Sequence, residues 1–451
     1  MALTGRTALL ALLGAVVVAL VAPTAGGVLG VTLAVLALAG LDAGLAGSVT
    51  ALRVTRSPDT RVRLGESTDT RLTVTNTGRR PVRGVLRDAW PPSAGASPRR
   101  LALDVPAGQR RVVGSTLHPT RRGDRRAARV TVRSVGPLGL AARQRSRTVS
   151  GTVRALPAFT SRRHLPSRLA RLRDLDGSSP VAVRGPGTEF DALRQYVPGD
   201  DVRSIDWRGT ARGGGVVVRT WRPERDRSVF VVLDTGRTSS GRLETPAGPT
   251  TRLDVLLDAA LLLIALATRA GDRIGLVALD RTVRAQLRDP ARARALAAVT
   301  EVTATVEPAL VETDHRLLAR TVLTRAPAGA LVVVLTGLDG PVVTAGLRPA
   351  LASLLRRHTV VVAAVSDPAS VAPAVTAAGG GRGDGDGRGD GDGDDVGAAY
   401  GAGAAARDRL DRAEAAAELA RDGVVVLDAL PDAVAPRLAD LYLELKRTGR
   451  L

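Results

Sequence analysis

The feature that most restricts the fold of this chain is an alternation of apolar strands and helices in its C-terminal half. Short uninterrupted runs of Val, Leu and Ala are typical of strands buried on both faces of a sheet. The expected strands are 228–234, 272–279, 330–337, 359–365 and 423–430, and the expected helices are 250–271, 290–305, 313–325, 343–357, 404–421 and 431–447. This alternation predicts an α/β doubly wound parallel sheet over residues 226–451, with helices on both faces.

Two apolar runs near the N-terminus predict a membrane anchor. Residues 8–22 and 28–41 are apolar and uncharged, and a Pro/Gly break at 23–27 separates them. Each run is close to the roughly 17–25 residues that a membrane-spanning helix needs. We therefore expect residues 1–48 to form a transmembrane hairpin of two helices.

The charges that flank these runs predict the topology of the anchor. Arg6 precedes the first run, Arg53 and Arg56 follow the second, and the turn between the runs carries no charge. The positive-inside rule then places both ends of the hairpin, and the soluble regions, on the cytoplasmic side of the cell membrane. The alternative is a cleaved signal peptide over residues 1–25.

Residues 50–156 have the pattern of an all-β domain. The stretches 71–78, 110–119 and 128–137 are rich in β-branched residues and are bounded by Gly, Pro or Asn. Turn signals recur about every ten residues, which favours a small antiparallel β-sandwich.

The positive charge of the chain is concentrated in and just after this region. Residues 57–180 hold 26 Arg against 8 Asp and Glu, a net charge of +18, whereas the whole chain has a net charge of +20. Basic residues beside a membrane anchor are attracted to anionic membrane lipid. Nucleic acid is not expected as a partner, because the basic region lacks interleaved aromatic residues. The chain has no Cys, which excludes disulfides and thiol chemistry.

Two further segments are expected to have little regular structure. Residues 157–225 connect the two folded regions and contain many polar residues and glycines. Residues 379–403 are a Gly/Asp-rich tract that cannot bury apolar surface, and they are expected to be a disordered insertion in the α/β domain.

Residues 187–212 read GTEFDALRQYVPGDDVRSIDWRGTAR. This segment closely resembles the signature of the bacterial domain-of-unknown-function-58 family. The paired apolar runs, RRG at 121–123, GPLGL at 136–140 and AGDRIGLVALD at 270–280 agree with that family too. The resemblance implies a membrane-anchored protein with a von Willebrand factor A-like domain that works with a MoxR-type AAA+ ATPase.

Aromatic residues, carboxylates and arginines alternate in this signature, and two interpretations of them stay open. They can form a clamp that packs on the α/β domain through ion pairs, or a surface that binds a partner. A pair of catalytic carboxylates is not expected, because no sugar- or phosphate-binding context lies beside them. The signature residues are Glu189, Phe190, Asp191, Arg194, Tyr196, Pro198, Gly199, Asp200, Asp201, Arg203, Asp206, Trp207 and Arg212.

The resemblance also implies a metal-ion-dependent adhesion site at the end of the first α/β strand. Its ideal pattern is Asp-x-Ser-x-Ser, completed by a Thr and an Asp from later loops. Here Asp234 and Thr238 fit, Gly236 replaces the first Ser, Thr313 is the expected Thr, and the later Asp is either missing or displaced to Asp339. Oxygen ligands of this kind suit Mg²⁺, so the resemblance implies a degenerate magnesium site. The alternative is that the fold survives as an interaction scaffold that binds no metal.

No catalytic motif accompanies these features. The chain has no G-x-S-x-G, no Walker A sequence and no glycine-rich dinucleotide motif after a strand, so we do not expect an enzyme. The predicted function is a membrane-anchored adapter for protein–protein interaction that works with a MoxR-type ATPase. The alternative is a cell-envelope scaffold that has no ATPase partner.

Overall fold

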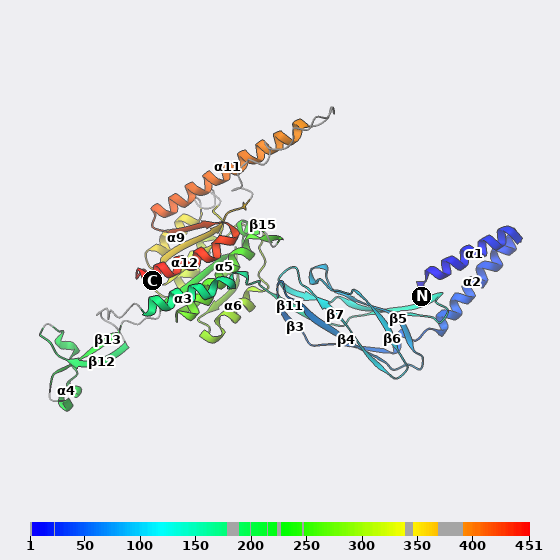
Figure 1. The fold of residues 1–451 in the computed structure, drawn as a ribbon, viewed down its shortest axis with the longest axis horizontal. Helices are drawn as coiled ribbons and strands as arrows, with labels where there is room; N and C mark the ends of the chain where they lie inside the picture. Colours follow the sequence, from blue (N-terminus) through cyan, green and yellow to red (C-terminus); the bar gives the residue numbers. More distant parts are fainter. Residues whose placement is uncertain are drawn as a thin grey trace. The chain divides into compact units, whose positions relative to one another are not determined.

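The chain divides into two compact units, Met1–Ala158 and Phe159–Leu451 (Figure 1). The computed structural model describes residues 2–21, 23–177, 189–198, 200–213, 215–222, 227–245, 248–338, 346–368 and 391–451. Its architecture is mixed α/β, with both antiparallel and parallel sheets.

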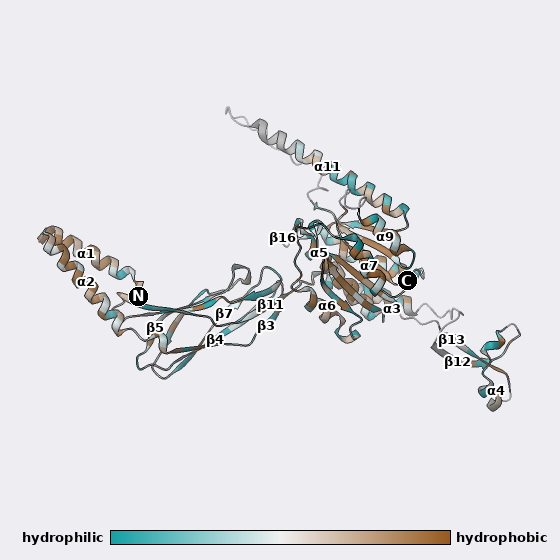
Figure 2. Ribbon diagram, turned by 180° about the vertical axis from the view of Figure 1, so that it is seen from behind, coloured by the Kyte–Doolittle hydropathy of each residue, from teal (hydrophilic) through white to brown (hydrophobic). Residues whose placement is uncertain are grey.

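The first unit begins with two apolar helices, α1 (Gly5–Val21) and α2 (Ala25–Leu45). They pack closely, since a Cβ on Gly14 of α1 would lie 2.4 Å from Val31 of α2. Their outward leucines and valines are exposed, and Figure 2 shows both helices as mainly hydrophobic ribbons. Within the described residues, one helical stretch, Ala25–Ala51, is long and apolar enough to cross a membrane, and α1 is shorter. The expected pair of spans is therefore supported for one of its two helices.

The helix pair is tied to a loop of the β region through Asp42, which is fully buried. Its carboxylate accepts hydrogen bonds from the backbone N–H groups of Leu138 (2.7 Å), Leu140 (2.7 Å) and Ala141 (2.9 Å). At the start of α1, the Thr4 hydroxyl donates to the carbonyl of Gly139 at 2.6 Å. The beginning of α1 and the end of α2 are thus held by the same loop, 136–141.

The rest of this unit is made of short strands in three sheets. The strands are β1 (Ala2–Leu3), β2 (Leu52–Arg56), β3 (Thr60–Arg63), β4 (Thr68–Asn76), β5 (Val82–Ala89), β6 (Arg100–Val105), β7 (Arg110–Leu117), β8 (Gly123–Arg126), β9 (Arg129–Val135), β10 (Ala141–Arg147) and β11 (Thr152–Leu156). Sheet A has the order β1-β10-β9-β5-β6, sheet B the order β2-β4-β7, and sheet C the order β3-β11-β8. One hydrophobic cluster draws Leu86 and Val132 from sheet A and Leu72 and Val74 from sheet B. The strands expected near 71–78, 110–119 and 128–137 are confirmed as β4, β7 and β9.

A buried ion pair crosses the interior of this unit. The Arg56 guanidinium makes two hydrogen bonds with the Asp88 carboxylate, at 2.7 and 2.8 Å, and the two side chains are only 3% and 1% exposed. The Trp90 indole N–H donates to the same carboxylate at 2.8 Å, and the guanidinium carbon lies 5.0 Å from the centre of the Trp90 ring. Arg56 is therefore not a free charge beside the membrane, as the topology argument from sequence assumed, because Asp88 neutralises it inside the fold.

The second unit is built on the main sheet, with the order β18-β17-β14-β19-β20-β21. Its strands are β14 (Ser228–Asp234), β17 (Arg273–Leu279), β18 (Val283–Arg288), β19 (Leu331–Leu335), β20 (Thr359–Val365) and β21 (Val425–Ala429). All neighbours pair in parallel except β17 and β18, which pair antiparallel. The expected parallel sheet is confirmed, with an antiparallel edge strand added by a turn after β17.

Helices cover both faces of the main sheet. They are α3 (Leu165–Gly177), α5 (Arg252–Arg269), α6 (Ala295–Thr303), α7 (His315–Arg325), α9 (Arg348–Leu355), α11 (Gly391–Arg421) and α12 (Pro431–Arg447). Alternate residues of β14 point to opposite faces: Val229, Val231 and Leu233 pack in the cluster with α5 and α12, whereas Phe230 and Val232 pack in the cluster with α7 and α9. A strand buried on both faces explains the uninterrupted apolar run in the sequence.

Two segments differ from expectation. Residues 157–225 were expected to be a connection, but α3 within them packs on α5 and α12 and buries Leu172 in the core of the second unit. Residues 391–403, the end of the tract expected to be disordered, form the beginning of α11, while residues 379–390 lie outside the described residues. The alanine-rich stretch that follows residue 403 favours helix and extends it toward the N-terminus.

His358 precedes β20 and is 7% exposed, and neither ring nitrogen has a hydrogen-bond partner among the described residues. Burial, aided by the charge of Arg357, lowers the pKa of His358. The folded state therefore favours the neutral ring. Above about pH 6.5 the protonation of His358 does not lower the stability of the fold, and as the pH falls below that value it destabilises the fold.

We expect His358→Leu to stabilise the protein by about 1 kcal/mol at pH 7.5, because it removes two unsatisfied polar atoms. The gain should be larger at pH 5.5, where the unfolded wild-type chain binds a proton at His358 and the folded chain resists it. Thermal unfolding at both pH values measures this. Equal differences between variant and wild type at the two pH values would contradict the assignment.

Candidate metal and partner site

Asp234 is the last residue of β14, at the carboxyl edge of the main sheet. β14 pairs with β17 on one side and with β19 on the other. Among the strands of this sheet β14 comes first in the chain, and the strands that follow it lie on both of its sides, so the sheet has a topological switch point here. Such switch points leave a crevice at the carboxyl ends of the strands. The fold therefore brings Asp234 to the position where open α/β sheets bind ligands.

Three threonine hydroxyls and a backbone amide converge on the Asp234 carboxylate. Thr238 donates to it at 2.9 Å, Thr336 at 2.5 Å, and Thr313 through a short hydrogen bond. The Gly236 N–H donates to it at 2.8 Å. Asp234 is 1% exposed, so its charge is held by these donors rather than by water.

The structure gives a steric reason for Gly236, which departs from the ideal adhesion-site pattern. A Cβ at this position would lie 2.2 Å from the Thr313 hydroxyl and 2.8 Å from the carbonyl oxygen of Val311. A serine here would displace the loop that carries Thr313. The glycine thus makes room for the threonine hydroxyl that approaches Asp234 from the second loop.

The oxygen atoms of these side chains are the type of ligand that a hard cation such as Mg²⁺ prefers. Each threonine hydroxyl gives its one hydrogen to Asp234 and keeps its oxygen lone pairs, which are the part that a cation uses. Asp234, Thr238 and Thr313 are brought together as predicted, and Thr336 joins them. Asp339, predicted as a further ligand, lies outside the described residues. Those residues contain no cluster of three or more His, Asp or Glu side chains that could hold a metal, so the donors are mainly hydroxyls.

A second layer of charge surrounds this cluster. Asp280, after β17, is fully buried and accepts hydrogen bonds from the Thr235 hydroxyl at 3.2 Å and from Arg284 at 2.6 Å. Burial alone would raise the pKa of Asp280, but these donors and the Thr282 N–H hold it below its ordinary value. Arg237, in the loop after Asp234, forms an exposed ion pair with Glu312 at 3.2 Å.

His315 is the first residue of α7. Burial lowers its pKa, against the opposing fields of Asp234 and Asp314.

The signature segment folds into a small module of its own. β12 (Glu189–Gln195) pairs antiparallel with β13 (Val217–Arg222), and a short η4 turn (Val202–Ser204) and α4 (Trp207–Gly213) lie between them. Glu189, Phe190 and Asp191 are in β12, Arg212 is in α4, and Gly199 lies outside the described residues.

The carboxylates of this module hold its turns together. Asp200 pairs with Arg194 and accepts the Val197 N–H at 3.0 Å. Asp201 caps η4 by accepting the Arg203 N–H at 2.9 Å. Through these hydrogen bonds the two carboxylates stabilise the turns of the module.

Asp206 has the same kind of use at the start of α4. It accepts the Gly209 N–H at 2.8 Å and pairs with Arg219 at 2.7 Å. These donors lower the pKa of Asp206. The carboxylate is therefore fixed in its ionised form as a helix cap.

The apolar side chains of this module are exposed. Trp207 is 70% exposed, and Val202, Val197 and Leu193 are 64%, 56% and 45% exposed. Large exposed side chains that are grouped in one small module are typical of protein-binding surfaces.

Residues 192–375 match the family model described as "Protein of unknown function DUF58". This part of the chain belongs to the DUF58 family. The matched range contains Asp234 and the three threonines that contact it, together with the signature from Arg194 onward. Glu189 to Asp191 immediately precede it.

Two of the relatives found among curated proteins are described as uncharacterized proteins. Proteins of Mycobacterium bovis and Mycobacterium tuberculosis are each 29% identical to this chain over 206 residues, which are 44% of this chain and 61% of theirs. The match thus spans less than two thirds of these relatives. Among solved structures, the CARDB domain of a Pyrococcus furiosus protein, in complex with di-metal ions, covers 22% of this chain and 86% of its own at 18% identity, with a TM-score of 0.16.

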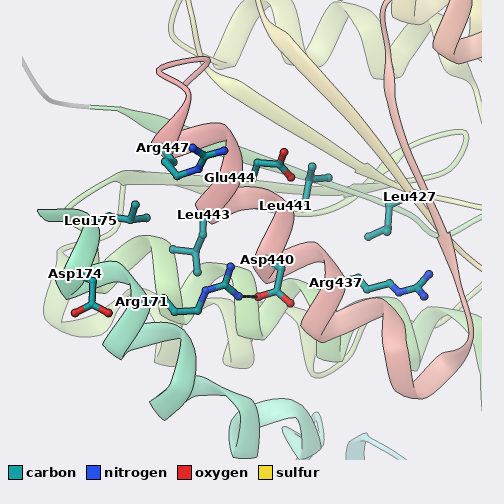
Figure 3. Close-up of a pocket in the computed structure, with 10 residues that line it drawn as sticks. All are labelled: Arg171, Asp174, Leu175, Leu427, Arg437, Asp440, Leu441, Leu443, Glu444 and Arg447. Atoms are coloured by element: carbon teal, nitrogen blue, oxygen red, sulfur yellow. Dashed lines mark hydrogen bonds and ion pairs between the residues drawn. The ribbon is translucent and has the colours of Figure 1, made fainter. Parts of the chain in front are cut away.

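A separate cavity of about 660 Å³ lies against α3, β21 and α12 (Figure 3). Its charged residues are mixed in sign, and Asp440 is already paired with Arg171 at 2.6 Å and with Arg168 at 2.9 Å. Because its charges are largely balanced within the protein, this cavity favours no single class of ligand.

Proposed function

We propose that this chain is a membrane-anchored adapter whose second unit is a von Willebrand factor A-like interaction domain. The observation that carries the proposal is the cluster of Asp234, Thr238, Thr313 and Thr336 at the switch point of the main sheet. An oxygen-rich crevice at this edge is suited to hold Mg²⁺ and, through an open coordination position, a carboxylate of a partner protein.

The proposed partner is a MoxR-type AAA+ ATPase, which the family resemblance implies. The signature module supports a second contact with such a partner, because Trp207 and Val202 expose apolar surface on a scaffold fixed by ion pairs. Catalytic residues are not part of this proposal. Asp200, Asp201 and Asp206 are used in turns and caps, so we favour an adapter over an enzyme.

The first unit supplies the anchor in this proposal. α1 and α2 form a transmembrane hairpin, and sheets A and B pack as a β-sandwich on its cytoplasmic side, where ATP is available. Arg6 and Arg80 lie where the helices meet the β region, and Arg80 donates to the Gly44 carbonyl at 2.6 Å. Their charges are suited to anionic lipid headgroups at that level.

Magnesium binding gives the proposal a direct test. A ligand that binds only the folded state at ten times its Kd stabilises it by about 1.4 kcal/mol, which corresponds to a shift of roughly 2–4 °C in Tm for a domain of this size. We expect that shift with millimolar Mg²⁺ for wild type and its loss in Thr313→Val, which keeps the side-chain shape and removes one hydroxyl.

Thr300→Val is the matched control, because Thr300 is a buried threonine whose hydroxyl donates to the Leu296 carbonyl within α6 rather than to Asp234. It should keep the magnesium response. If wild type shows no shift, or if Thr313→Val responds as strongly as Thr300→Val, the metal site is wrong.

A further inference from the structure

The outer face of sheet A carries a concentration of arginines. Residues alternate between buried and exposed along β5, β6 and β9, so every second side chain points to solvent. The arginines on this solvent face are Arg83, Arg87, Arg100, Arg129 and Arg133. Asp104 shares the face and pairs with Arg83 at 3.5 Å.

Three of these arginines form a cluster across adjacent strands, which we call the arginine triad: Arg87, Arg100 and Arg129. In the strand register Arg87 stands directly opposite Arg100, and Arg129 stands opposite Ala89, diagonal to Arg87. Like charges at directly opposed positions destabilise a sheet. Among the described residues, no hydrogen bond or ion pair offsets the charge of any of the three. A fold that keeps this repulsion is suited to an anionic ligand that relieves it.

Membrane lipid is a poor occupant for the triad. The helix pair is attached at loop 136–141, directly after β9. Arg129, at the other end of β9, is seven residues from Gly136, which is roughly 23 Å along an extended strand. Figures 1 and 2 show the strands of this unit running away from the helix pair. A separation of this size exceeds the Debye length of about 8 Å in physiological salt, so headgroups around the helices do not neutralise the triad.

We propose that the arginine triad is a docking surface for an acidic, carboxylate-rich segment of a partner protein. Planar guanidinium groups bind carboxylates through paired hydrogen bonds. The arginines stand on strands about 4.8 Å apart, and their long side chains can splay to reach acidic side chains about 6.6 Å apart on one face of an extended peptide. Nucleic acid is less favoured, because the solvent face of sheet A offers no aromatic side chain on which a base could stack. This proposal does not depend on the magnesium site or on the ATPase.

The test uses the full chain in nanodiscs of zwitterionic lipid and a fluorescein-labelled deca-glutamate peptide as the probe. Anisotropy should show binding that weakens with salt. We expect the triple variant Arg87→Gln/Arg100→Gln/Arg129→Gln to weaken binding at least tenfold. The corresponding triple lysine variant, which keeps the charge but loses the paired hydrogen bonds, should weaken it several-fold.

The matched control is Arg71→Gln/Arg110→Gln/Arg111→Gln, which removes the same charge from exposed positions on sheet B. It should bind the peptide within twofold of wild type. Equal losses in the two glutamine triples would overturn the proposal, since binding would then follow net charge alone. Tighter binding of a single-stranded oligonucleotide, or of anionic vesicles, through the triad would also overturn it.

Discussion

Replacing Arg56 with alanine is expected to destabilise the first unit by roughly 3–5 kcal/mol, which is the usual cost of removing one partner from a buried ion pair. Asp88, which is 1% exposed, would keep its charge inside the fold with only Trp90 as a remaining side-chain donor. The Trp90 ring would also lose the guanidinium group that lies 5.0 Å from its centre. Hydrogen exchange of peptides from β4 and β5, measured in the full-length protein, should accelerate strongly.

Arg83→Ala is the control for this experiment. Arg83 pairs with Asp104 at 3.5 Å, but the two side chains are 72% and 64% exposed. Exposed pairs contribute about 0–1 kcal/mol, because water and salt screen them. Hydrogen exchange in Arg83→Ala should therefore match wild type, and similar effects of the two substitutions would show that the buried pair has no special importance.

Asp42→Ala is expected to release the helix pair from loop 136–141. The substitution leaves the N–H groups of Leu138, Leu140 and Ala141 without their acceptor, at a cost of roughly 3–6 kcal/mol for hydrogen bonds to a charged group. The loop should open locally, and its amides should exchange with solvent far faster than in wild type. Mass spectrometry of the peptide that covers 136–141 measures this in nanodiscs.

Asp59→Ala is the matched control for Asp42. Asp59 accepts a single backbone N–H, from Thr152 at 2.7 Å, at an exposed position. Its loss should leave exchange in the 136–141 peptide unchanged. Slow exchange of that peptide in Asp42→Ala would mean that the helix pair is held by other contacts, such as the Thr4 hydroxyl.

The sequence predicts those parts of the fold that depend on local pattern. β14, β17, β19 and β20 are continuous apolar runs because both of their faces are buried, and that pattern is visible without a structure. β18 was not predicted, because its sequence VRAQLR is mostly polar and it pairs only at an edge. β12 and β13 were missed for the same reason: they form a two-stranded module rather than part of a buried sheet.

Long-range pairing explains the other differences. Arg56 appears in the sequence as a charge that flanks an apolar run, and its partner Asp88 is 32 residues away. Asp42 appears as an interruption of an apolar run, whereas in the structure it organises a loop almost 100 residues later. Neither role can be read from neighbouring residues, because both depend on how the strands of the first unit are brought together.

Only part of the candidate site was predicted, because one of its residues depends on long-range pairing of strands. Asp234 and Thr238 lie within one strand-end motif, and Thr313 is the threonine that the family resemblance implies for a later loop, so the resemblance points to all three. Thr336 was passed over because the expected ligand in that loop is an acid. Its hydroxyl reaches Asp234 only because β19 lies beside β14 in the sheet.

The most direct test of the adapter function is crosslinking in native membranes, followed by affinity purification and mass spectrometry, with wild type, Thr313→Val and Thr300→Val compared. The account predicts that a AAA+ ATPase is enriched with wild type and with Thr300→Val, and that this enrichment is lost with Thr313→Val. Absence of any AAA+ ATPase from the wild-type sample would contradict the account and favour a cell-envelope scaffold.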